Sequence, residues 1–219
     1  MSESIEPSRR ALLLAGSALA FVPGRAWSGA QKYEPLADSV RSALAGEIAD
    51  RRPPVRTFAT VDERMAYLAW LGEMSDRLSG RLPDYTTRVE FLKTLDYEAT
   101  RSGLDRQMVL GLIQVESNFR KYVVSVAGAR GYMQVMPFWT RLIGDGEPRG
   151  LFEMRTNLRF GSVILRHYID IENGDLFMAL GRYNGSRGRK QYPDAVIAAW
   201  HGRWQYDVAA PTVPARPKV

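Results

Sequence analysis

One carboxylate in the sequence stands in a setting that favours acid–base chemistry. The segment Met108–Val115 is almost entirely apolar, has helical periodicity and leads directly into Glu116. Val109 and Ile113 share one face of that helix with Glu116, so we expect Glu116 to be at least partly buried. No Lys or Arg stands in the preceding turn, and the C-terminal end of a helix is its negative pole. Burial and the dipole both raise the pKa of a carboxyl group, as a general acid near neutral pH requires.

A structural role for Glu116 is the alternative. A glutamate at a helix end can pair with a neighbouring cation such as Arg120 or simply face solvent. Taken alone, Glu116 favours this alternative, because ion pairs and exposed carboxylates are common at helix ends. The residues that follow reverse that preference.

Ordered blocks after Glu116 carry a resemblance to a known family. Residues 116–119 read Glu-Ser-Asn-Phe, and residues 125–137 read Ser-x-x-Gly-Ala-x-Gly-x-Met-Gln-x-Met-Pro. Residues 157–161 read Asn-Leu-Arg-Phe-Gly, and the pair Tyr183-Asn184 follows. In this order the blocks resemble the soluble lytic transglycosylase family, whose core is similar to goose-type lysozyme. The resemblance covers roughly residues 100–204 and leaves residues 31–103 uncovered.

The resemblance implies one catalytic residue and a set of saccharide contacts. Glu116 would be the single catalytic acid and base, and the residues implied to contact saccharide are Ser125, Tyr132, Gln134, Met136, Tyr183 and Asn184. An amide can donate to and accept from sugar hydroxyls, and a tyrosine ring can stack on a sugar. Met136 and Tyr132 could equally be packing residues. Asn157 is expected to cap a helix rather than to bind a ligand.

The block around Tyr183 departs from the family pattern. Arg182 stands where the family usually has a small residue, and the spacing of the following glycines differs. We therefore expect the groove near this loop to have an altered shape. The nearby cations could attract glycan or peptide carboxylates or could form a solvated basic loop; they are Arg182, Arg187, Arg189 and Lys190.

The number of carboxylates separates the possible reactions. Most glycosidases use two carboxyl groups about 5 to 9.5 Å apart. Here only Glu116 stands in a motif, and no role follows from the sequence for Asp145, Glu147, Glu153 or Asp175. The resemblance implies a peptidoglycan lytic transglycosylase that cleaves the MurNAc–GlcNAc bond without water and forms a 1,6-anhydromuramyl product. A hydrolytic muramidase or chitinase on the same core, and a non-catalytic glycan-binding module, are the alternatives.

Composition excludes several other classes of protein. The chain has 219 residues, no cysteine and two histidines, which excludes disulfide frameworks, iron–sulfur clusters, thiol nucleophiles and Cys-ligated zinc. We expect no metal and no other cofactor. The net charge of +6 favours a polyanionic partner, such as nucleic acid, an anionic membrane or a cell-wall polymer. The basic residues are scattered rather than aligned on one helix, which disfavours nucleic acid. The family resemblance implies peptidoglycan glycan strands as the partner.

The start of the chain has the layout of an export signal. Arg9 and Arg10 precede twelve apolar residues at 11–22, and small residues follow a turn at Pro23-Gly24. A run of this length is too short to span about 30 Å of hydrocarbon, so we expect removal of residues 1–30 and no stable membrane span thereafter. The arginine pair favours the twin-arginine route to the periplasm over the ordinary secretory route. The alternative to an export signal is a mature amphipathic helix. No partner in the envelope machinery is specified.

The rest of the chain predicts one helix after another. Helices are expected over roughly 33–51, 61–78, 85–103, 106–116, 156–173, 175–183 and 191–204, with Thr60, Asp84 and Asp105 as N-caps. A stripe on the second of these helices is expected to be buried, and its members are Met65, Leu68, Leu71, Met74 and Leu78.

These elements predict an all-α, lysozyme-like catalytic domain with an N-terminal helical extension packed on it. The expected division is an export signal at 1–30, the extension at 31–103, the catalytic domain at 104–206 and a flexible tail at 207–219.

Overall fold

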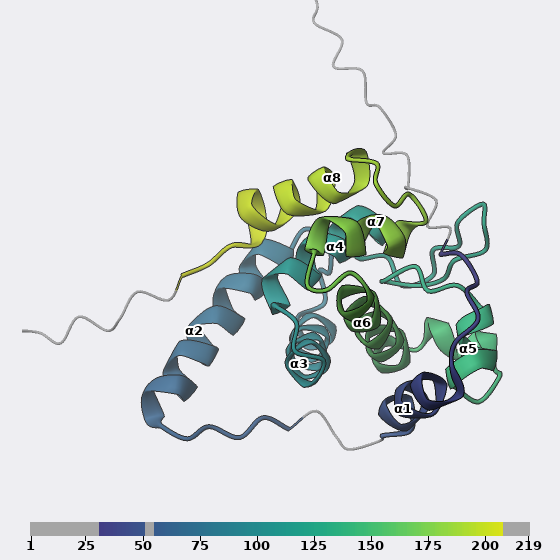
Figure 1. The fold of residues 1–219 in the computed structure, drawn as a ribbon. Helices are drawn as coiled ribbons and strands as arrows, with labels where there is room; N and C mark the ends of the chain where they lie inside the picture. Colours follow the sequence, from purple (N-terminus) through teal and green to yellow (C-terminus); the bar gives the residue numbers. More distant parts are fainter. Residues whose placement is uncertain (1–30, 51–54, 208–219) are drawn as a thin grey trace, which may run out of the picture.

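Helices make up most of the chain that the structure describes. This computed structural model describes residues 31–50 and 55–207, so the predicted export signal and most of the predicted tail lie outside it. Within those ranges the only extended pairing is a pair of isolated bridges from Arg130 to Val124 and Val135. The all-α prediction is therefore confirmed. In chain order the elements are α1 (Asp38–Ala49), α2 (Val61–Leu78), α3 (Tyr85–Arg101), α4 (Arg106–Ser117), α5 (Phe138–Ile143), η1 (Pro148–Phe152), α6 (Met154–Ile171), α7 (Leu176–Asn184), α8 (Gln191–Ala199) and η2 (Trp200–Trp204) (Figure 1).

Polar side chains cap α2, α3 and α4 as predicted. The Thr60 hydroxyl accepts a hydrogen bond from Glu63 N at 3.1 Å, and the Glu63 carboxylate accepts one from Ala59 N at 2.9 Å. Asp84 and Asp105 accept hydrogen bonds from backbone N–H groups in the first turns of α3 and α4. Each cap satisfies donors that would otherwise have no partner at a helix start.

The buried face of α2 differs from the predicted one. Met65 and Leu68 are 60% and 45% exposed, so the prediction that they are buried is wrong. The helix instead buries a neighbouring stripe made up of Tyr67, Trp70, Met74 and Leu78. Turning this stripe inward removes two aromatic side chains from water, which buries more apolar area than Met65 and Leu68 would.

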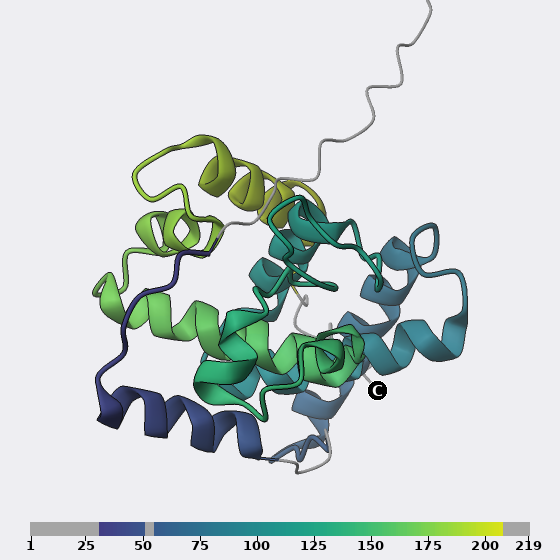
Figure 2. The same cartoon turned by 90° about the vertical axis from the view of Figure 1, so that its right-hand side faces the viewer.

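α6 is the central helix, and the N-terminal helices pack around it. It contacts α1, α3 and α7, while α2 packs on the far side of α3 (Figure 1). Figure 2 shows α1 running alongside α5 and α6, which it contacts. The predicted packing of the N-terminal extension on the second half of the chain is therefore confirmed. None of the described helices combines the length and the apolarity needed to cross a membrane.

Candidate active site

Glu116 is buried in the last turn of α4. The residue is 1% exposed, and its Oε1 accepts a hydrogen bond from the Tyr192 hydroxyl at 2.5 Å. Oε2 is buried and has no hydrogen-bond partner among the described residues. The alternative pairing with Arg120 is absent, since the Arg120 guanidinium donates to the Ser117 carbonyl instead. The predicted burial of Glu116 is confirmed.

Burial keeps Glu116 protonated near neutral pH. Desolvation raises the pKa of Glu116 to about 8, and the hydrogen bond from Tyr192 opposes this rise in part. A pKa one unit above the pH leaves about nine tenths of the carboxyl groups protonated at pH 7. Glu116 is thus an acid at the pH where most enzymes work, as the sequence predicts.

Tyr192 reaches Glu116 because α8 lies directly against α4. A Cβ at Gly111 of α4 would stand only 2.9 Å from the backbone nitrogen of Trp200, at the end of α8. Glycine therefore permits the two helices to approach this closely. Tyr192 was missed in the sequence analysis, since it lies 76 residues after Glu116 and in none of the recognised blocks.

Residues 125–137, which include Gly128 and Gly131, form a loop after α4 that is held by three helices. The Ser117 hydroxyl of α4 donates to the Tyr132 carbonyl at 2.7 Å, and the Tyr183 hydroxyl of α7 donates to the Met133 carbonyl at 2.7 Å. From α6, the Asn157 Oδ1 accepts a hydrogen bond from Met133 N at 2.8 Å. The loop is thereby fixed next to Glu116, whose charge also acts on Tyr183.

Asn157 does not cap a helix, so that expectation is wrong. α6 begins at Met154 with Glu153 in the N-cap position. Asn157 is fully buried. Its Oδ1 accepts the hydrogen bond from Met133 N, and its Nδ2 donates to the carbonyls of Arg130 and Leu151 at 2.8 Å each. Its role is to hold the loop against α6.

The predicted saccharide contacts lie at different depths. Ser125 and Met136 are half-buried, whereas a second group is buried and does not face solvent: Tyr132, Gln134, Tyr183 and Asn184. Gln134 has a left-handed backbone with a φ of 48°, which is uncommon for a residue other than glycine. Contact with saccharide stays a prediction for all six.

Three of the predicted site residues each carry a buried polar atom with no hydrogen-bond partner among the described residues. Gln134 Oε1 and Asn184 Nδ2 are buried without a hydrogen-bond partner, as Glu116 Oε2 is. Buried polar atoms are rarely left unpaired, because each costs roughly 1–3 kcal/mol of desolvation. Unpaired atoms on three predicted site residues favour a functional role for the group.

Gln31 is a further residue at this site that the sequence analysis missed. Its Oε1 accepts a hydrogen bond from Met136 N at 3.2 Å, and its Nε2 donates to the Gln134 carbonyl at 3.5 Å. Gln31 is 3% exposed and also forms a hydrogen bond that lowers the pKa of Tyr183 in part. Since the recognised blocks begin near residue 100, nothing in them could indicate a residue so far upstream.

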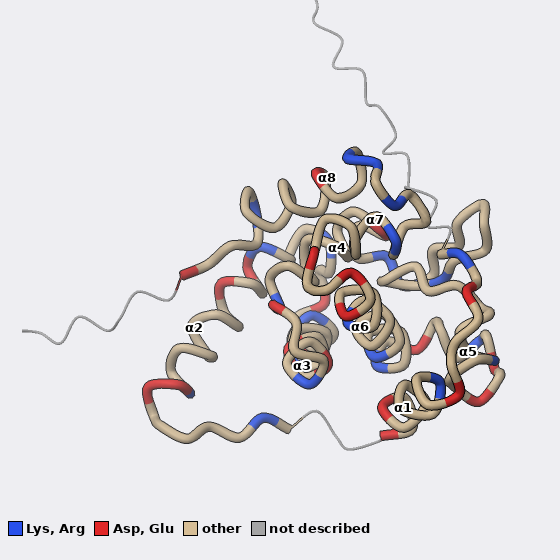
Figure 3. The backbone as a smooth tube through the Cα atoms, in the orientation of Figure 1, with Lys and Arg blue, Asp and Glu red and all other residues tan. Residues whose placement is uncertain are grey.

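Arg182, the departure from the family pattern, anchors the basic loop. Arg182 and Arg187 each donate to Glu172 Oε1 at 2.7 Å, and Arg182 also donates to Glu34 at 2.7 Å. The hydrogen bond from Arg187 is the main reason why the pKa of Glu172 falls to about 2. Figure 3 shows the concentration of basic residues between α7 and α8. A hollow of about 330 Å³ lies here, lined by Lys32, Glu34, Arg182, Gly185, Ser186, Arg187 and Arg189.

No second carboxylate acts on Glu116 in the described part of the chain. Asp175 caps α7 and Glu147 caps η1, while Asp145 accepts a hydrogen bond from Glu147 N. None of them contributes to the raised pKa of Glu116. Over residues 31–50 and 55–207, no three His, Asp or Glu side chains cluster so that they could hold a metal ion.

Comparison with known proteins places the site within one recognised domain. Residues 93–195 match the family model of the transglycosylase SLT domain. Membrane-bound lytic murein transglycosylase C of Haemophilus influenzae (strain PittEE) is 31% identical over an alignment of 114 residues that covers 45% of this chain and 32% of that protein. The transglycosylase of Enterobacteria phage PRD1 is 28% identical over an alignment of 116 residues that covers 50% of this chain and 42% of that protein. The chain therefore spans less than half the length of either relative.

Two solved structures also resemble this chain. An inactive mutant of lytic transglycosylase Slt from Pseudomonas aeruginosa is 24% identical, with 64% of this chain and 26% of that chain covered and a TM-score of 0.42. The 70 kDa soluble lytic transglycosylase of Escherichia coli is 18% identical, with 80% and 33% covered and a TM-score of 0.40. On the evidence of the family model, the resemblance seen in the sequence is confirmed, and residues 93–195 of this chain match the transglycosylase SLT domain.

Proposed function

We propose that this chain is a peptidoglycan lytic transglycosylase in which Glu116 is the only catalytic carboxyl group. The observation that carries the proposal is the burial of Glu116 without a cation or a second carboxylate, which raises its pKa to about 8. A relative that is 31% identical over part of the chain is named a membrane-bound lytic murein transglycosylase. The match to the SLT domain covers Glu116. A two-carboxylate hydrolase would need a second group for which the described residues offer no candidate beside Glu116.

The reaction uses Glu116 first as an acid and then as a base. The protonated carboxyl donates its proton to the glycosidic oxygen, and the bond between that oxygen and C1 of the muramyl residue breaks. The neighbouring acetamido group of the substrate assists departure at C1. The Glu116 carboxylate then takes the proton from the C6 hydroxyl, whose oxygen bonds to C1 and closes the 1,6-anhydro ring. The proton that Glu116 lost is restored, and no water is consumed.

Tyr192 suits both stages of this cycle. Burial and the neighbouring Glu116 raise the pKa of Tyr192 well above its ordinary value, so its hydroxyl remains a donor. Its hydrogen bond occupies Glu116 Oε1, which leaves Oε2 to carry the proton. When Glu116 becomes a carboxylate, the same hydrogen bond stabilises the negative charge. Tyr192 therefore acts as a positioning residue for the acid.

Digestion of purified peptidoglycan tests the proposal. Glu116→Gln keeps the size of the side chain but cannot transfer the proton, so turnover is expected to fall by at least about a hundredfold while glycan binding is retained. The exposed Glu47 of α1 provides a matched control, and Glu47→Gln should digest peptidoglycan like the wild type. Undiminished activity in Glu116→Gln would remove this residue from the mechanism.

The mass of the products distinguishes the proposed reaction from the alternatives. Wild-type protein should release anhydromuropeptides, each lighter by one water than the product of a muramidase. Reducing-end products would indicate a hydrolase on the same core. Binding without any product would indicate a glycan-binding module.

We also propose that the protein is exported to the periplasm, through the twin-arginine route. The support is the sequence layout of residues 1–30, with Arg9-Arg10 ahead of an apolar run and small residues near its end. Mass analysis of the N-terminus in the periplasmic fraction should show a start between about Ser28 and Gln31. An intact Met1 terminus in that fraction would contradict the predicted cleavage.

A further inference from the structure

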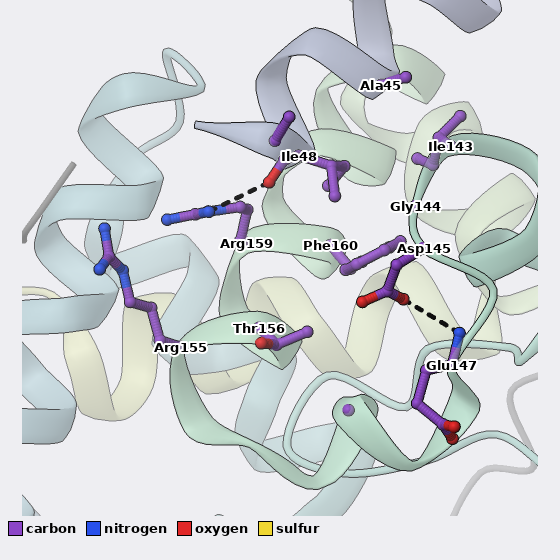
Figure 4. A pocket seen from close by; sticks show the side chains of 12 residues that line it. Ala45, Ile48, Ile143, Gly144, Asp145, Glu147, Arg155, Thr156, Arg159 and Phe160 are labelled. Atoms are coloured by element: carbon purple, nitrogen blue, oxygen red, sulfur yellow. Dashed lines mark hydrogen bonds between the residues drawn. The ribbon is translucent and has the colours of Figure 1, made fainter. Parts of the chain in front are cut away.

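A second pocket lies between α1, the connection from α5 to η1, and the first turns of α6 (Figure 4). Its volume is about 660 Å³, within the range of roughly 300–1,000 Å³ typical of small-ligand sites. No residue of α4, α7 or α8 lines it, and neither do the predicted catalytic and saccharide-binding residues. Part of its lining is apolar and consists of Ala45, Ile48, Ile143 and Phe160.

The wall formed by α6 carries an excess of positive charge. The fully buried Glu98 pairs with three guanidinium groups, at 3.0 Å from Arg101, 3.7 Å from Arg155 and 3.1 Å from Arg159. Asp50 lies 3.8 Å from Arg101, so among the described residues of this cluster three guanidinium groups face two carboxylates. Arg155 is the guanidinium group that these carboxylates satisfy least. Its buried Nε and Nη2 form no hydrogen bond with a described residue, Nε lies 3.7 Å from Glu98 Oε1, and 34% of the side chain is exposed.

The opposite wall carries two carboxylates. Asp145 and Glu147 line the pocket, are exposed, and each accepts a hydrogen bond from a backbone N–H, at 3.0 and 2.9 Å. Neither forms an ion pair with a Lys or Arg in the described part of the chain. Figure 4 shows the Arg155 side chain on one side of the pocket and the Asp145 carboxylate on the other, with Thr156 between them. The two walls therefore present opposite charges across an apolar lining.

We propose that this pocket binds a short zwitterionic peptide, with the peptide carboxylate at Arg155 and its ammonium group at Asp145. A simple anion such as phosphate would be repelled by Asp145 and Glu147, and a simple cation would be repelled by the guanidinium groups. A ligand with both charges satisfies both walls, and an aliphatic side chain between them can pack on Ile48 and Ile143. This proposal is independent of the glycan chemistry at Glu116.

Calorimetric titration of the full chain with three forms of one tripeptide tests the proposal. Ala-Leu-Ala carries both charges, its N-acetyl form lacks the ammonium group, and its C-terminal amide lacks the carboxylate. The free peptide should bind, and each blocked form should bind about tenfold more weakly, since each has lost one charged contact. Failure of Ala-Leu-Ala to bind at about 10 mM, or equal binding of all three forms, would overturn the proposal.

Two variants assign each end of the peptide to its wall. In Arg155→Met the amidated and free peptides should bind equally, and in Asp145→Asn the acetylated and free peptides should bind equally. Glu98 keeps Arg101 and Arg159 when Arg155 is replaced, so we expect the fold to survive. Asp145 is exposed, which keeps the test decisive even if Arg155→Met does not fold.

Matched controls change the same charges outside the pocket. Arg64 and Asp62 are exposed on α2, which does not line the pocket, so Arg64→Met and Asp62→Asn should bind all three peptides like the wild type. If these controls weaken binding as much as the pocket variants do, general charge attraction accounts for the result and the assigned site is wrong. Because no glycan cleavage is measured, this outcome leaves the function of Glu116 unaffected.

Discussion

The stability advantage of Glu116→Gln over the wild type should grow as the pH rises. Burial raises the pKa of Glu116 from 4.5 to about 8. Between these values the unfolded chain has released a proton that the folded chain retains, so this carboxyl group lowers stability as the pH increases. The effect is absent below the unfolded pKa and complete above about pH 8. Glutamine does not titrate and therefore escapes this loss.

The size of the effect follows from the two pKa values. The free energy of unfolding changes by about 1.4 kcal/mol for each pH unit in which one proton separates the states. From pH 5 to pH 7.5, after allowing for partial protonation of the unfolded chain at pH 5, the expected change is about 3 kcal/mol. Glu116→Gln should therefore gain about 3 kcal/mol relative to the wild type over this interval.

Urea unfolding at pH 5 and pH 7.5 measures this difference. The buried Trp70, Trp139 and Trp204 report unfolding by fluorescence. Glu47→Gln is the control, because Glu47 is exposed and its replacement should alter the difference by less than about 0.5 kcal/mol. A constant difference between Glu116→Gln and the wild type at both pH values would refute a buried, protonated Glu116.

Three further substitutions test the supports of the site. Asn157→Ala removes three hydrogen bonds to the loop and should lower the free energy of unfolding by about 3 kcal/mol in urea titrations; a loss below about 1 kcal/mol would contradict its role. Gly111→Ala places a Cβ against the α8 backbone, so the free energy of unfolding should fall by about 1–3 kcal/mol and peptidoglycan turnover should fall with it. Gly72→Ala is the control and should be tolerated, because an added Cβ there meets no neighbouring atom within 4 Å. Glu172→Gln should lower the urea midpoint at pH 7, because the depressed pKa of about 2 makes this carboxylate stabilising above about pH 4.5. The difference in midpoint from the wild type should shrink as the pH falls towards 2. An equal difference at pH 7 and pH 3 would contradict the ion pairing.

Local sequence features were sufficient to predict an interaction where the interacting residues are close in the chain. Thr60 and Glu63 are three positions apart, so their capping interaction could be predicted without knowledge of the fold. The same holds for the burial of Glu116, because an apolar helix that must be covered on both faces also covers the residue at its end.

Helical periodicity alone could not predict which face of α2 is buried. Met65 and Leu68 have the spacing of a core stripe, yet Tyr67 and Trp70 are the side chains that reach the core. Both stripes have helical periodicity and share Met74 and Leu78. The choice between them depends on how α2 packs on α3, which periodicity alone does not specify.

The sequence by itself determined the helical class, the helix caps and the carboxyl group on which the proposed chemistry depends, because these follow from residues within one or two turns of each other. Only the tertiary structure decided what surrounds that carboxyl group. Tyr192 comes from 76 residues downstream, and Gln31 lies more than 100 residues before the loop that it contacts. Such partners are set by how closely α4 and α8 approach and by where the segment before α1 lies, and neither distance is encoded in a local pattern.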